Sequence, residues 1–184
     1  MTIMNTNQPW VNSDGLAVKF PKLEVEQGKG GEICSNYSPK LLEVDISYLT
    51  LTTGVTAAPD SATEVVILDY NLYLPAGCTI ERIEVVADTA WTSAGDGFKL
   101  NVGTVRKTDF TTIVDADGLI DSLAETAMDT PHTVVRIDAE SNTTYLGALL
   151  DDADQIATYD VVLCAWWETE APTAGAGKIR IFYR

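Results

Sequence analysis

The chain has 184 residues, of which 46% are hydrophobic, so we expect one folded domain with a core of its own. Its 27 acidic residues outweigh 12 basic ones, and the net charge of −15 disfavours nucleic acid as a partner, because phosphate contacts need Lys and Arg. No apolar run approaches the roughly 18 residues of a membrane span, and the polar N-terminus lacks a signal peptide's apolar stretch, so we expect no membrane partner.

Residues 1–40 are predicted to form an extended N-terminal arm. Their four lysines balance four acidic residues, so the whole charge of −15 falls on residues 41–184. The segment is too short and too interrupted by proline and glycine to bury its own surface. Large apolar side chains are nevertheless costly to leave in water, so we expect the arm to dock on a partner or a neighbouring subunit. The predicted contact residues are Trp10, Val18, Phe20 and Leu23.

Residues 41–184 have the rhythm of an all-β domain. Leu42, Val44 and Ile46 alternate with charged residues, which is typical of a half-buried strand. Further strands are expected at 64–74, 79–87, 98–102, 133–137, 145–150, 159–167 and 178–184. About eight short strands separated by turn residues predict an antiparallel β-sandwich of the jelly-roll type.

One segment, residues 115–128, is predicted to be helical. Leu119, Ile120, Leu123 and Ala127 fall at the spacing of an apolar helical stripe. The segment is short, so we expect a crossover helix between strands and not a separate layer.

The C-terminal stretch, residues 159–184, is predicted to be a β-hairpin around a loop rich in Pro, Gly and Thr. Its first strand is apolar on both faces, so we expect a central strand that is covered on both sides.

The final strand places Lys178, Arg180 and Arg184 on one face with Phe182. Two interpretations are open. The cations either protect an exposed sheet edge from unwanted pairing, or meet an acidic surface of a sister subunit or partner.

Groups that could carry chemistry are sparse in the sequence. His132 is the one histidine, and no nucleophile, zinc, phosphate-loop or dithiol motif accompanies it. A calcium loop at Asp115 fails because Ile113 and Ala124 occupy ligand positions. Asp115 or Asp117 is therefore expected to form a turn or helix cap, and the acidic cluster at 151–154 a solvated loop. We predict no catalytic residue, no metal site and no cofactor.

The aromatic and cysteine residues have structural interpretations too. Trp166 and Trp167 lie in a core-like strand and are expected to pack there, whereas a glycan-binding role would need an exposed ring such as Trp91. The cysteines are three in number and far apart: Cys34, Cys78 and Cys164. They are expected to be free thiols of a protein made in a reducing cytoplasm.

Several short phrases resemble capsid-accessory proteins of tailed bacteriophages, and in particular the jelly-roll domains of phage decoration proteins. These phrases are residues 10–20, 28–32, 42–46, 74–78, 100–103, 115–119 and 174–183. The resemblance implies a non-enzymatic cement protein on the outer surface of a phage head. Its implied partners are the major capsid protein and further copies of this chain, as a dimer or trimer. The alternatives are a head-fibre or tail module that binds a receptor or glycan, and a glycan-degrading enzyme.

Overall fold

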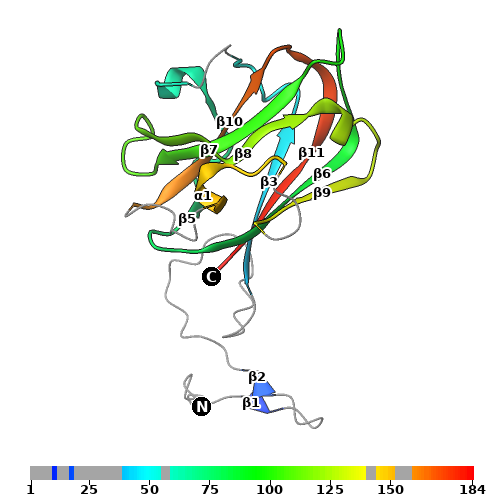
Figure 1. The fold of residues 1–184 in the computed structure, drawn as a ribbon. Coiled ribbons are helices and arrows are strands. Elements are labelled where there is room, and N and C mark those ends of the chain that lie inside the picture. Colours follow the sequence, from blue (N-terminus) through cyan, green and yellow to red (C-terminus); the bar gives the residue numbers. More distant parts are fainter. Residues whose placement is uncertain (1–9, 12–16, 19–38, 55–58, 140–143, 152–158) are drawn as a thin grey trace, which may run out of the picture. The chain divides into compact units, whose positions relative to one another are not determined.

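The computed structural model describes residues 10–11, 17–18, 39–54, 59–139, 144–151 and 159–184 (Figure 1). The chain divides into two compact units, Met1–Ile33 and Cys34–Arg184. In the first unit, β1 (Trp10–Val11) pairs antiparallel with β2 (Ala17–Val18), and Trp10 lies opposite Val18. Phe20 and Leu23 lie outside the described residues, so the docking of the arm stays a prediction.

The second unit is an antiparallel β-sandwich (Figure 1). One sheet has the strand order β3-β11-β6-β9, and the other has β10 between β7 and the short strands β4 and β5, with β8 beyond β7. The first sheet comprises β3 (Lys40–Ser47), β11 (Pro172–Tyr183), β6 (Ile80–Ser93) and β9 (Thr133–Ile137). The second comprises β4 (Val66–Ile67), β5 (Tyr73–Leu74), β10 (Val161–Glu168), β7 (Lys99–Arg106) and β8 (Ile113–Ala124).

This strand order is a jelly roll. The pairs β3·β11, β10 with β4 and β5, β6·β9 and β7·β8 are those of one long antiparallel hairpin that has been rolled up. Only its tip, β7 and β8, joins strands that are neighbours in both sequence and sheet. Apart from β4 and β5, which both pair with β10, rolling places the other consecutive strands of the body in opposite sheets. The apolar faces of the two sheets meet between them.

The core fills the space between the sheets. Alternate residues of β3 and β11 point inward, so Val44 and Ile179 are buried while Glu43 and Lys178 face solvent. Trp91 is fully buried and stacks on Phe98 with ring centroids 5.3 Å apart. The largest fully buried side chains are Trp91, Phe98, Leu74, Ile83, Leu100, Leu119, Ile120, Leu123, Met128, Ile137 and Leu163.

The prediction that the strand at 159–167 is central and covered on both sides is confirmed. β10 buries one face in the main core and the other in a second apolar cluster with Val65 and Val105. Trp166 is 2% exposed in that cluster, and its indole Nε1 donates a 3.0 Å hydrogen bond to the carbonyl oxygen of Ala116. Trp166 therefore packs in the interior, as predicted.

Three expectations about elements are wrong. The C-terminal hairpin does not form, because β10 and β11 belong to opposite sheets. Residues 115–128 are not helical: most of them lie in β8, followed by the 3₁₀ turn Glu125–Ala127. The stretch 145–150 is not a strand but holds one bridge, Leu146 to Ile120, and the start of α1 (Ala148–Asp151).

The helical content of the described part is very small. α1 has four residues, and the two 3₁₀ turns, Ala62–Glu64 and Glu125–Ala127, have three each. Within the described ranges, no helix is long and apolar enough to cross a membrane.

Candidate interaction surface

The outer face of the β3-β11-β6-β9 sheet carries a grid of charged side chains, which we call the charged face. Strand register places Arg180 of β11 opposite Glu43 of β3 on one side and Glu84 of β6 on the other. Glu84 in turn lies opposite Arg136 of β9. One row across the sheet thus reads Glu43–Arg180–Glu84–Arg136, with the sign of charge alternating at every step. We call it the alternating row.

Two cations of the final strand form ion pairs with β3. Lys178 Nζ lies 3.1 Å from Glu43 Oε1 and 2.9 Å from Asp45 Oδ1, and Arg180 Nε lies 2.7 Å from Glu43 Oε2. Hydrogen bonds from Arg180 and then Lys178 lower the pKa of Glu43. Bonds to Asp45 and Glu43 raise the pKa of Lys178. Both residues therefore stay ionised at neutral pH.

The position of β11 removes one of the two interpretations of the basic stripe. β11 pairs with β3 on one side and β6 on the other, so its cations do not protect a sheet edge. The stripe is also not a uniformly basic surface, because acidic side chains of the neighbouring strands face it. Its role as an interface remains a prediction.

The other two residues of the stripe lie toward one end of the sheet. The guanidinium carbon of Arg82 lies 3.5 Å from the ring centroid of Phe182, and Arg82 Nε bonds Glu84 at 3.0 Å. Arg184 follows the end of β11 and lies 3.6 Å from Glu81 Oε1.

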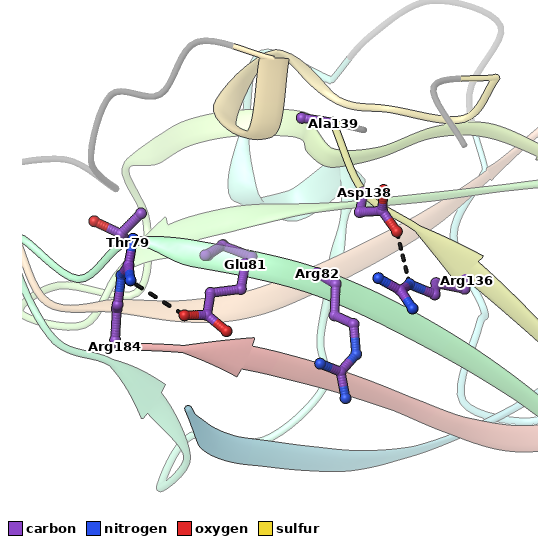
Figure 2. A pocket seen from close by; sticks show the side chains of 8 residues that line it. Thr79, Glu81, Arg82, Arg136, Asp138, Ala139 and Arg184 are labelled. Atoms are coloured by element: carbon purple, nitrogen blue, oxygen red, sulfur yellow. Dashed lines mark hydrogen bonds and ion pairs between the residues drawn. The ribbon is translucent and has the colours of Figure 1, made fainter. Parts of the chain in front are cut away.

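A depression of about 340 Å³ opens beside these residues, and Figure 2 shows its lining. Arg136 reaches Asp138 at 2.7 Å and Arg184 reaches Glu81, while Arg82 extends away from the Arg136–Asp138 pair. The guanidinium groups do not converge on one point, so the arrangement does not form an anion pocket. These ion-paired side chains extend the charged face to the end of the sheet.

The charged face is almost neutral in a strongly acidic protein. It holds five cations and six carboxylates: Arg82, Arg136, Lys178, Arg180, Arg184, Glu43, Asp45, Glu81, Glu84, Asp88 and Asp138. Residues 41–184 contain eight basic and 23 acidic residues. Of those outside the charged face whose side chains the structure describes, three are basic and 13 are acidic, a net charge of −10. Repulsion between two copies of the chain is therefore weakest when these faces meet.

A second exposed group lies near one end of the other sheet. Tyr70 is 57% exposed and meets Phe110 edge to face, with ring centroids 5.1 Å apart. Lys107 Nζ lies 3.2 Å above the ring of Tyr73, and the guanidinium carbon of Arg106 lies 3.8 Å above that of Tyr159. Sequence analysis missed this aromatic group, because its rings come from separate loops and strand ends.

The structure also places the residues that were considered for chemistry. His132 occupies a turn with φ 66°, where its backbone N–H donates to the carbonyl oxygen of Ala87. Asp115 and Asp117 lie in β8 and do not cap a helix. Trp91, which a glycan-binding role would need at the surface, is fully buried. Among the described residues, no three His, Cys, Asp or Glu side chains gather in a way that could hold a metal ion.

Two of the cysteines, Cys78 and Cys164, are buried free thiols, as predicted. Burial raises the pKa of Cys78 to about 11 and that of Cys164 to about 12. Cys34, and Asp152 and Asp154 of the acidic cluster, lie outside the described residues.

Comparison with known proteins finds similarity to two solved structures. The chain is 19% identical to a chain of "Capsid of Ralstonia phage GP4", with a TM-score of 0.47, covering 85% of this chain and 92% of that one. It is 14% identical to a chain of "Cyanophage Pam1 capsid asymmetric unit", with a TM-score of 0.45, covering 89% and 98%. No protein-family model and no curated protein matches the sequence.

Proposed function

We propose that this chain is a non-enzymatic structural protein of a phage virion, a decoration or cement protein bound to the outer surface of the head. The observation that carries the proposal is a jelly-roll body with a core filled by its own side chains. The predicted arm of residues 1–40 precedes this body in the sequence. The short sequence phrases that resemble phage decoration proteins support the same role.

We propose different roles for the two parts of the chain: the body supplies a stable fold, and the arm supplies attachment. The filled body needs no partner to bury its core, so it is a stable block. The arm carries Trp10, Val18, Phe20 and Leu23 and would gain by burying them against the major capsid protein or a neighbouring copy. A protein that binds only the assembled shell stabilises that shell, because disassembly must also break the added interface.

The test is binding of the purified protein to expanded empty heads, measured by co-sedimentation. The full chain should bind, and a variant that lacks residues 2–30 should bind at least about tenfold more weakly, because the apolar contacts of the arm are lost. Circular dichroism of the truncated variant should retain the β spectrum. Undiminished binding by a folded truncated variant would contradict the role of the arm, and no binding by the full chain would contradict the proposed function.

A second candidate function has one observation in its favour. The exposed rings of Tyr70, Tyr73 and Tyr159 form a surface on which sugars can stack, as in a head-fibre or tail-associated glycan-binding module. Binding to host-surface polysaccharide that is lost on Tyr70→Ala and Tyr159→Ala, with no binding to heads, would favour this candidate.

A further inference from the structure

We infer that two copies of this chain pack charged face against charged face, about a two-fold axis parallel to the strands. The inference concerns the free protein and does not depend on the proposed role at the phage head.

The alternating row is complementary to itself under this symmetry. The two-fold axis reverses the order of strands in the second copy, so β3 faces β9 and β11 faces β6. Glu43 then lies opposite Arg136 of the other copy, and Arg180 lies opposite Glu84. All four charge pairs between the two rows are attractive. Closed two-fold contacts are also the commonest way in which identical chains associate.

Arg180 retains donors for such a contact. It uses Nε for its ion pair with Glu43 within the chain. Within the described part of the chain, its terminal amino groups make no hydrogen bond. A guanidinium can bind two carboxylates at once, so the partner's carboxylates can be added without breaking the existing pairs.

Apolar side chains complete the surface beside the alternating row. Val134 is 53% exposed and Val86 lies opposite it in the register. Leu41, 52% exposed, is opposite Phe182 at the other end of the grid. About the two-fold axis, Val86 faces Lys178 of the other copy and Phe182 faces Arg82. The apolar groups therefore pack on the aliphatic stems of these cations, and this supplies the part of the contact that salt does not weaken.

The net charge restricts where copies can meet. The other described side chains of residues 41–184 share a net charge of −10, so contacts between their surfaces bring like charges together. The charged face has a net charge near zero and an internal pattern that selects one register. We therefore assign the second copy to this face.

The experiment uses the full chain and two charge reversals, Arg180→Glu and Glu84→Arg. In a pair of Arg180→Glu chains, the carboxylate introduced at position 180 of each copy faces Glu84 of the other, so the two-fold contact contains two like-charge pairs. A pair of Glu84→Arg chains contains two repulsive pairs between arginines. In the mixed pair, position 180 of one variant faces position 84 of the other with opposite charges, and every facing pair is attractive.

Sedimentation velocity over about 1 to 300 μM measures the self-association. We expect wild-type dimers that weaken as salt rises from about 50 to about 500 mM. Each reversal alone should weaken the dimer at least about tenfold, and an equimolar mixture should recover it. Lys99→Glu, a reversal of the same size on the opposite sheet, should dimerise like the wild type.

Several outcomes would overturn the inference: a wild-type monomer at every concentration, a trimer, dimers of both single variants at wild-type strength, or no recovery in the mixture. Thermal unfolding confirms that each variant is folded. Should a reversal fail to fold, Arg180→Gln removes the same attraction without adding repulsion, and it must still weaken the dimer. Unaltered dimerisation of that variant would equally overturn the inference.

Discussion

Asp117 lies half-buried in β8, and its environment disfavours the charged form. Desolvation comes first, followed by a side-chain hydrogen bond and repulsion from Asp115, and together they raise the pKa of Asp117 to about 6. Between pH 4 and 6, the carboxyl of Asp117 is mostly protonated in the folded chain and mostly ionised in the unfolded chain, so folding in this range takes up a proton. Its ionisation therefore lowers the free energy of unfolding as pH rises through that window, and the loss is complete above it.

Replacing this carboxyl by an amide should remove the penalty. Asp117→Asn keeps a hydrogen-bonding group beside Asp115 and should raise the free energy of unfolding at pH 7 by about 1 kcal/mol, since solvent screening reduces the full effect of the shift. At pH 4 the variant and the wild type should be nearly equal. Urea unfolding at a series of pH values measures both, and a gain that is the same at pH 4 and 7 would contradict the assignment.

Asp109 provides a control, because its pKa is shifted in the opposite direction to that of Asp117. Backbone N–H groups of Thr111 and Thr112 lower its pKa to about 2. Its contribution to stability is present above pH 4 and is lost as pH falls toward 2. Asp109→Asn should therefore destabilise the protein at neutral pH and leave the change between pH 4 and 6 intact.

At the scale of elements, alternation was a good guide where strands are regular. Leu42, Val44 and Ile46 identified β3, and the doubly apolar stretch 161–167 identified β10 as a covered strand. The prediction failed in β8, because Leu119, Ile120 and Leu123 are all buried at a spacing that imitates a helix. The cause is an extra residue in β8: Leu100 pairs with Leu123 and Val102 with Ile120, so a step of two residues along β7 matches a step of three along β8.

The prediction of a hairpin at the C-terminus was wrong for a different reason. Sequence neighbours pair by default, but in a jelly roll most consecutive strands lie in opposite sheets. Pairing between distant strands also limited what the sequence could predict of the candidate site. Alternation placed Lys178, Arg180 and Phe182 on one face, whereas their partners Glu43 and Glu84 depend on register between strands that are far apart in sequence.

Gly177 permits the close approach of β11 and β6 at a register shift. A Cβ atom there would clash with the carbonyl oxygen of Val86, which is backbone and cannot move alone. Gly177→Ala should therefore lower the free energy of unfolding by about 2 kcal/mol or more. Gly95→Ala is the matched control, because its nearest neighbour is the movable carboxylate of Glu170 at 3.1 Å. Equal stability of the two variants in urea would contradict this account.

At the scale of the whole molecule, the net charge and the jelly roll favour a protein that acts through its surfaces. Among the described side chains, the acidity is concentrated outside the charged face, and buried apolar residues fill the interior between the sheets. Both properties agree with the proposed place on the outside of a phage head, away from DNA, where the body and the predicted arm would add contacts to the shell.

The temperature at which DNA leaves the phage particle tests the cementing role most directly. Particles assembled without this protein should release DNA at a lower temperature than complete particles, because the shell lacks the added interface. Adding back purified full-length protein should restore the higher temperature, and the variant without residues 2–30 should not. Equal release temperatures with and without bound protein would contradict the proposal that this chain stabilises the head.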